Sequence, residues 1–152
     1  MKELKAKDVM VSPAVNVPLG TSLEAAARLM LEKGIGSLLV VDEGGRLQGI
    51  LTETDFLKER GIPFSTFRAP MLLGRFLDGG QLERLLEEAR TTKVEEIMSS
   101  PVHAVGPEEP LKRVLDLMLT YDINHVPVVD KEGRPIGIVS RFDLVRLLSQ
   151  RA

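Results

Sequence analysis

The chain has 152 residues, of which 43% are hydrophobic and 28% charged, a composition typical of a globular protein and not of a disordered chain. It has no cysteine and only two histidines, His103 and His125, which excludes disulfides, thiolate zinc sites and histidine-rich metal sites. A net charge of −2 argues against nucleic-acid binding, and no apolar run approaches the roughly 18 residues of a membrane span. The sequence therefore predicts a cytoplasmic protein with no nucleic-acid or membrane partner.

The chain contains an internal repeat. At a fixed offset of 88, residues 9–57 align with 97–145 without a gap, and 17 of the 49 positions are identical. Two copies are too few for a solenoid, so we expect a pseudo-symmetric pair. The repeats occupy residues 5–60 and 93–149.

The first repeat predicts the order β-α-β-β-α. A short strand at 15–17 precedes a helix at about 22–33, where Thr21 and Glu24 have the spacing of a capping box. Strands follow at 37–41 and 47–51 around an Asp-Glu-Gly-Gly turn, and a short helix starts at Thr52. The first two strands should pair as a parallel crossover, and the last two as an antiparallel hairpin.

The insert at residues 61–92 is not repeated. A proline-bounded loop precedes an amphipathic helix predicted at about 80–90. Arg68 and Arg75 flank an apolar run, which fits either an extra packing layer or a lid that closes over a ligand. We favour the packing layer.

The second repeat follows the same order. Its strands are predicted at 103–105, 125–129 and 136–139, and its helix at 110–121 has Pro110 at the first helical position. Met10, Met30, Met98 and Met118 occupy matching positions, and we interpret them as core residues.

Each repeat has a strand that ends in a hydroxyl residue, with an aspartate three positions later. These elements are Thr52 to Asp55 and Ser140 to Asp143. One interpretation is a plain helix N-cap with an acidic third residue. The other is a ligand site, in which the free N–H groups attract a phosphate and the aspartate accepts hydrogen bonds from two ribose hydroxyls. The paired occurrence favours the ligand site.

These residues resemble the CBS domain family, as a tandem pair of CBS domains, or Bateman module. The resemblance rests on the Val-Met and Ile-Met openings, the strand around residues 123–130, the Gly-Ile strands and both Ser/Thr-x-x-Asp elements. It implies an α+β fold, with α/β-type repeats packed sheet to sheet. It also implies a homodimer that binds AMP, ADP, ATP or S-adenosylmethionine in clefts between its repeats, with no required cofactor.

The resemblance also implies which residues form the two sites. The second repeat supplies Ser140, Arg141, Asp143, Ile123, Asn124, His125 and Pro127, and the first supplies Thr52, Asp55, Ile35, Gly36 and Ser37.

The two predicted sites differ in charge and at one strand position. The first repeat departs from the family pattern at Leu39, where a proline such as Pro127 is usual. It also has Glu53 where the second repeat has Arg141. A guanidinium attracts a phosphate and a carboxylate repels it. If only one cleft binds a phosphorylated ligand, we expect it to be the Arg141 cleft.

The leading hypothesis is a non-catalytic regulatory module that binds an adenosine-containing ligand and signals in trans to an effector protein that the sequence does not identify. The alternative is a scaffold or dimerisation module with no bound nucleotide. An enzyme is disfavoured because no nucleophile–base pair, metal cluster or Walker-type glycine loop is visible.

Overall fold

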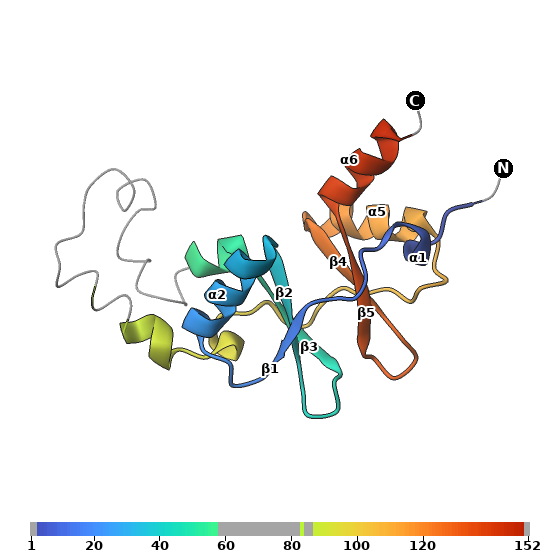
Figure 1. Cartoon of the computed structure of the whole chain (residues 1–152). Helices are drawn as coiled ribbons and strands as arrows, with labels where there is room; N and C mark the ends of the chain where they lie inside the picture. The colour runs from blue at the N-terminus through green and yellow to red at the C-terminus, as the bar shows by residue number, and fades with distance from the viewer. Residues whose placement is uncertain (1–2, 58–82, 84–86, 151–152) are drawn as a thin grey trace. The chain divides into compact units, whose positions relative to one another are not determined.

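The structure is a computed structural model that describes residues 3–57, 83 and 87–150 (Figure 1). In chain order its elements are α1 (Ala6–Val9), β1 (Asn16–Pro18), α2 (Leu23–Lys33), β2 (Ser37–Val41), β3 (Leu47–Thr52), the 3-10 helix η1 (Glu53–Leu57), the 3-10 helix η3 (Val94–Glu96), α5 (Leu111–Tyr121), β4 (His125–Val129), β5 (Pro135–Ser140) and α6 (Arg141–Ser149). Of the helix predicted at 80–90, residues 83 and 87–90 are helical, and residue 91 extends it. The predicted loop, with Arg68 and Arg75, lies outside the described residues.

The mixed α and β class is confirmed, and the first repeat has the predicted order of strands and helices, with the 3-10 helix η1 as its last described helix. Strands β1, β2 and β3 form one sheet in that order, and β4 and β5 form another. The register of β4 and β5 is antiparallel, with His125 opposite Ser140 and Pro127 opposite Ile138. The predicted hairpin of the second repeat is therefore confirmed.

The strand predicted at 103–105 is reduced to a single bridge. Val105 pairs with Val128 in parallel, as expected for the crossover, but no strand forms around it. The pairing cannot continue past Val105, because the Gly106 N–H donates to the Glu109 carboxylate at 2.7 Å and Pro107 has no N–H. His103 instead stacks on Tyr121, with ring centroids 3.8 Å apart.

Two helix starts differ from the prediction by one residue. The cap of α2 is Ser22, whose Oγ accepts from the Ala25 N–H at 3.1 Å, while the Thr21 hydroxyl donates to the Pro18 carbonyl. The predicted Thr21 capping box is therefore wrong. Pro110 is the N-cap of α5 and not its first helical residue, because its ψ of 149° is extended.

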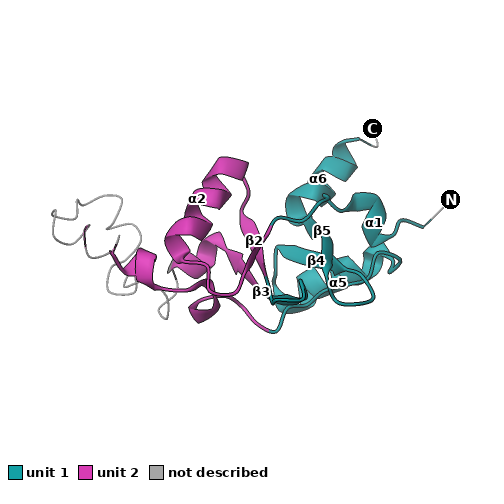
Figure 2. Ribbon diagram, turned by 60° about the horizontal axis from the view of Figure 1, so that its bottom comes forward, with its two compact units in different colours: residues 1–15, 41–48, 101–152 teal, residues 16–40, 49–100 magenta. Residues whose placement is uncertain are grey.

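The described residues form two compact units, coloured separately in Figure 2. Unit 1 contains residues 1–15, 41–48 and 101–152, and unit 2 contains residues 16–40 and 49–100. Each unit therefore combines most of one repeat with the first residues of the other, and unit 1 also includes residues 41–48 of the first repeat. The ranges 5–60 and 93–149, which define the sequence repeats, stay a prediction as domain boundaries.

Backbone hydrogen bonds attach these segments. In unit 1 the Ala6 N–H donates to the Glu109 carbonyl at 2.8 Å, and Val11 pairs with Ile138 in both directions. In unit 2, Ser99 pairs in the same way with Ile50. In both units, a segment at the start of one repeat therefore pairs with the last strand of the other repeat.

A methionine covers a strand glycine at each attachment. The Met10 side chain lies where a Cβ on Gly137 would be, and the Met98 side chain occupies the same place over Gly49. Both methionines are partly buried. Met30 and Met118 are buried in the cores of units 2 and 1, so the prediction that these two are core residues is confirmed.

Each unit has its own apolar core. In unit 1 the buried side chains of the core come from α5, β4 and β5, together with Ala6 of α1 and Val105: Ala6, Val105, Val114, Leu117, Met118, Val126, Val128 and Val139. In unit 2, buried apolar side chains come from α2, β2 and β3: Leu23, Ala26, Met30, Leu38, Leu39, Val40 and Leu51. Both cores include residues of the strands that lead into the predicted ligand sites.

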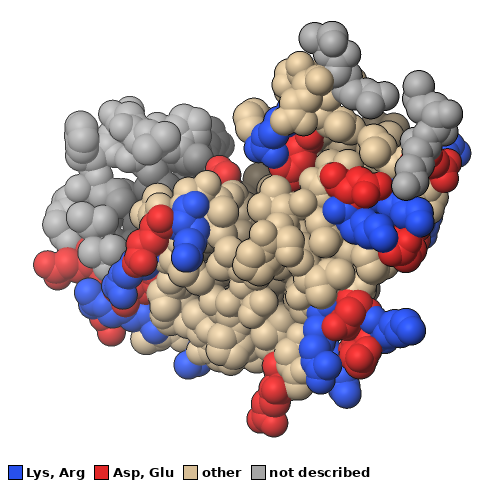
Figure 3. All heavy atoms as spheres, turned by 45° about the vertical axis from the view of Figure 1, so that its right-hand side comes forward, with Lys and Arg blue, Asp and Glu red and all other residues tan. Residues whose placement is uncertain are grey.

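Charges on the face shown in Figure 3 are intermixed, and basic residues do not gather into a separate patch there. One pairing is strong: Lys5 and Lys7 donate to the two oxygens of Glu108, at 2.8 and 2.7 Å. These hydrogen bonds lower the pKa of Glu108 to about 2. Among the described residues, no helix is long and apolar enough to cross a bilayer.

Candidate functional site

The predicted site of the second repeat is built at the start of α6. Ser140 is the N-cap, and its Oγ accepts from the Asp143 N–H. In turn, the Asp143 Oδ2 accepts hydrogen bonds from the Ser140 N–H at 2.8 Å and from the Ser140 hydroxyl at 3.0 Å. This reciprocal cap holds the Asp143 carboxylate against the helix start, with only 5% of the residue exposed.

The end of α5 and the start of β4 lie next to this cap. The Arg141 N–H donates to the Asn124 carbonyl at 3.0 Å, and the Arg141 Nε to the Ile123 carbonyl at 3.3 Å. His125 is opposite Ser140 in the sheet register. The structure therefore brings together six of the seven residues predicted for this site, and the seventh, Pro127, is buried two residues further along β4.

Arg141 does not point freely into solvent. Besides Ile123, its guanidinium contacts the Met118 carbonyl at 3.5 Å and the Asp122 carboxylate at 3.4 Å. These three acceptors stand at the C-terminal end of α5, where the helix dipole favours a positive charge. All three contacts are long for hydrogen bonds, so a phosphate would have weak competition for the guanidinium.

The first repeat has matching contacts to its aspartate at the start of the 3-10 helix η1. The Asp55 Oδ2 accepts from the Thr52 N–H at 2.7 Å and from its hydroxyl at 3.3 Å, and Asp55 is fully buried. The Glu53 N–H donates to the Gly36 carbonyl at 3.3 Å, which repeats the contact from Arg141 to Asn124. Ile35, Gly36 and Ser37 thus adjoin the cap, as predicted.

Sequence reasoning missed two features of these sites. Arg146, one helical turn after Asp143, donates to the Asp143 Oδ1 at 2.8 Å, and the spacing of three residues could have indicated this pair. In unit 2 the Ser99 hydroxyl lies 3.5 Å from the Asp55 Oδ1. No local pattern could indicate that contact, because Ser99 belongs to the second repeat and lies 44 residues after Asp55 in the chain.

Both aspartates accept hydrogen bonds from the residue that opens their helix, which agrees with the interpretation as a helix N-cap with an acidic third residue. The cap does not use up the acceptor capacity of Asp143, because a carboxylate can accept about four hydrogen bonds and Asp143 accepts three. The position left is on Oδ1, beside Arg146. The assignment of all these residues to ligand sites, and of those sites to a cleft between the repeats, stays a prediction.

The chain belongs to the CBS domain family, whose model matches residues 6–61 and 94–150. It is 28% identical over 94% of its length to a homoserine O-acetyltransferase from Methanohalobium evestigatum, but it spans only 24% of that protein. It is 32% identical to a CBS domain-containing protein from Dictyostelium discoideum, of which it spans 89%.

Solved structures of CBS domains have the same fold. The CBS domain of a CBS domain-containing membrane protein from Sphaerobacter thermophilus has a TM-score of 0.79 and 38% identity, over 95% of this chain and 88% of that one. The CBS domain pair of protein MJ0100, solved with 5′-methylthioadenosine and S-adenosyl-L-methionine, has a TM-score of 0.73 and 28% identity, over 99% and 100%. CBSX2 in complex with AMP has a TM-score of 0.72 and 26% identity, over 96% and 97%.

Proposed function

We propose that the chain is a non-catalytic regulatory module that binds an adenosine-containing ligand at its Ser/Thr-x-x-Asp elements. The observation that carries the proposal is the matching geometry of the two caps. Asp55 and Asp143 are held by the same backbone and hydroxyl contacts at equivalent positions of two repeats. Related CBS structures contain AMP, or 5′-methylthioadenosine with S-adenosyl-L-methionine.

In the second repeat, the Asp143 Oδ1 would accept from a ribose hydroxyl, and the first N–H groups of α6 would face a phosphate. Arg141 would leave the end of α5 to pair with that phosphate. Ile123, Asn124, His125 and Pro127 would line the remainder of the site. The candidate ligands are AMP, ADP, ATP and S-adenosylmethionine.

The two aspartates are held in place by the fold. Asp55 is fully buried and Asp143 nearly so, and each accepts hydrogen bonds from donors of its own helix start. A carboxylate fixed in this way is suited to accepting a hydrogen bond from a bound hydroxyl group. We therefore propose that binding, and not catalysis, is the role of these residues, and that no cofactor is required.

Ligand binding would regulate a partner by linkage. A ligand that binds one conformation more tightly than another shifts the population towards it, and a partner that prefers this conformation responds. We propose that the chain is cytoplasmic and acts in trans on an effector protein. The competing proposal is a scaffold or dimerisation module with empty sites.

Isothermal titration with AMP, ADP, ATP, S-adenosylmethionine and 5′-methylthioadenosine tests the proposal. A ligand present at one hundred times its Kd should add about 2.7 kcal/mol to the free energy of unfolding, which a thermal shift detects. If none of these compounds produces heat or a thermal shift, the ligand-binding role is rejected in favour of the scaffold.

The Arg141→Ala variant is expected to weaken AMP binding about tenfold, because a charge-assisted hydrogen bond contributes about 1.5–3 kcal/mol. Binding of 5′-methylthioadenosine, which has no phosphate, should stay unchanged. Arg113→Ala, which removes an exposed arginine of α5 that pairs with Glu109, is the matched control. If Arg141→Ala weakened the binding of AMP and of 5′-methylthioadenosine equally, Arg141 would not contact the phosphate.

We also propose a homodimer that uses the outer faces of α5 and α6. Phe142, Val145 and Leu148 lie on one face of α6 and are 67%, 58% and 75% exposed. Leu115 and Leu119 form a second exposed apolar pair on α5. Large exposed apolar side chains that recur at helical spacing are typical of an interface, and the covering surface in this proposal is a second copy of the chain.

The double substitution Val145→Glu and Leu148→Glu is expected to convert the dimer to a monomer at micromolar concentration. Each charge would be placed in a desolvated interface, whereas in the monomer both would face water. Light scattering after size-exclusion chromatography measures the mass. Leu19→Glu, at an exposed leucine in a turn of unit 2, should leave the mass unchanged. A monomeric wild-type chain, or a dimeric double variant, would contradict the proposal.

A further inference from the structure

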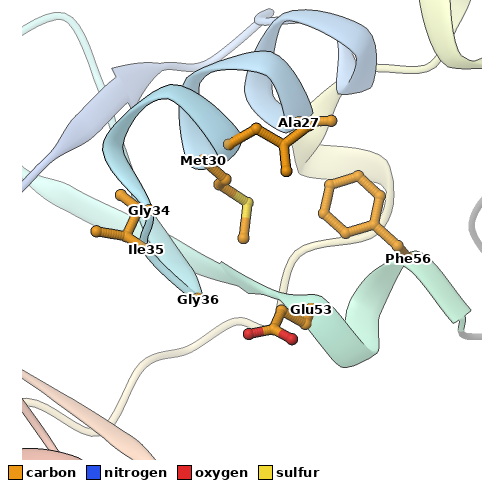
Figure 4. Close-up of a pocket in the computed structure, with 8 residues that line it drawn as sticks. Ala27, Met30, Gly34, Ile35, Gly36, Glu53 and Phe56 are labelled. Carbon is orange, nitrogen blue, oxygen red and sulfur yellow. The ribbon is translucent and has the colours of Figure 1, made fainter.

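A pocket of about 540 Å³ opens at the C-terminal end of α2, and we call it the α2 pocket (Figure 4). Most of its lining is apolar, with one carboxylate at Glu53: Ala27, Met30, Leu31, Gly34, Ile35, Gly36, Glu53 and Phe56. The volume is in the range of small-molecule sites. Only Ile35 and Gly36 also belong to the predicted adenosine site.

The Glu53 carboxylate lies over Gly36. A Cβ on Gly36 would be 2.6 Å from the Glu53 Oε1, so the glycine leaves room for the carboxylate at this end of the pocket. Glu53 is exposed, and among the described residues its side chain has no hydrogen-bond or ion-pair partner. The pocket thus combines an uncompensated negative charge with apolar walls and the aromatic ring of Phe56.

The second repeat has the same backbone frame at the end of α5. Gly34 and Asp122 both cap their helices in the left-handed conformation, with φ of 64° and 52°. The Ile35 N–H donates to the Met30 carbonyl at 3.0 Å, as the Ile123 N–H donates to the Met118 carbonyl at 3.1 Å. The two helix ends are therefore equivalent in backbone and differ in side chains.

What occupies the second helix end is a guanidinium. Arg141 occupies the position equivalent to Glu53 and places its guanidinium against two carbonyls and the Asp122 carboxylate. At the end of α2, the carbonyls of Met30 and Ile35 correspond to those of Met118 and Ile123. The nearby carboxylate there belongs to Glu53, whereas at the end of α5 it belongs to Asp122. No cationic side chain of the described residues lines the α2 pocket.

We propose that the α2 pocket binds a small organic cation that carries a guanidinium group on an apolar stem. The guanidinium would take the place at the end of α2 that Arg141 takes at the end of α5, with Glu53 as its counter-ion. The negative end of the helix dipole and the Phe56 ring both favour a cation there. The stem would lie along Met30 and Ala27.

The inference does not depend on adenosine binding, and its test uses no nucleotide. The full chain is titrated with n-butylguanidine while the amide signals are followed by two-dimensional NMR. Saturable shifts are expected at Gly34, Ile35, Gly36 and Glu53. n-Butylurea, which has a similar shape but no charge, is expected to leave these signals in place.

Glu53→Gln is expected to weaken n-butylguanidine binding about tenfold, because it removes the counter-ion and little else from an exposed position. Glu32→Gln, which removes an exposed carboxylate of α2 outside the pocket, is the matched control and should bind as the wild type does. Glu53→Arg should abolish the shifts, because the new guanidinium would fill the helix end as Arg141 does. Shifts at other residues, equal binding of n-butylurea, or unchanged binding by Glu53→Gln would overturn the proposal.

Discussion

Deleting residues 1–13 is expected to unfold unit 1, although residues 5–13 belong to the first sequence repeat and unit 1 consists mainly of the second. The segment donates or accepts five backbone hydrogen bonds with the second repeat, through Leu4, Ala6, Lys7 and Val11. At about 1 kcal/mol each, their loss costs about 5 kcal/mol, which approaches the whole stability of an ordinary domain. The deletion also exposes the core face that Ala6 covers.

Hydrogen exchange measured amide by amide tests this expectation. The amides of Val126 and Val139 in unit 1 should lose their protection, whereas those of Leu39 and Leu51 in unit 2 should change much less, because no deleted residue belongs to unit 2. A control that replaces Lys5 and Lys7 by Gln keeps the backbone bonds and removes only the exposed pairing with Glu108. Full protection of Val126 and Val139 in the deletion variant would contradict the role given to this segment.

Each unit includes the first residues of the other repeat, and this arrangement could not be predicted from the sequence. The order of elements, the hairpin turns and the two buried methionines follow from local patterns that a sequence carries in short windows. The pairing of Val11 with Ile138, or of Ser99 with Ile50, joins residues far apart in the chain. No periodicity encodes which partner such a short segment chooses, because that choice depends on packing.

The candidate sites show the same limit at smaller scale. The spacing of Ser140 and Asp143 predicts their reciprocal contact, because both residues belong to one helix start. The position of the Arg141 side chain depends on contacts with the end of α5, which is a separate element. The sequence alone does not show whether its guanidinium binds that helix end or a ligand. A charge difference such as Glu53 for Arg141 is visible in the sequence, whereas the pocket beside Glu53 needs the structure.

Asp143→Ala is expected to lower both stability and ligand binding, and the two losses have different origins. The substitution removes the acceptor of the Ser140 N–H and hydroxyl and leaves Arg146 without its partner. The free energy of unfolding should fall by about 2–4 kcal/mol, because a helix cap and charge-assisted hydrogen bonds are lost together. Chemical denaturation measures this part.

Binding is separated from stability by a comparison with Ser140→Ala. That variant loses the hydroxyl of the cap and about 1 kcal/mol of stability, but it keeps the Asp143 carboxylate and its Arg146 partner. If Asp143 holds the ribose, Asp143→Ala should weaken adenosine-ligand binding at least tenfold at a temperature where both variants are folded, and Ser140→Ala should weaken it far less. Equal losses of affinity would mean that both residues act on the ligand only through the helix cap, because a direct ribose contact depends on the carboxylate alone.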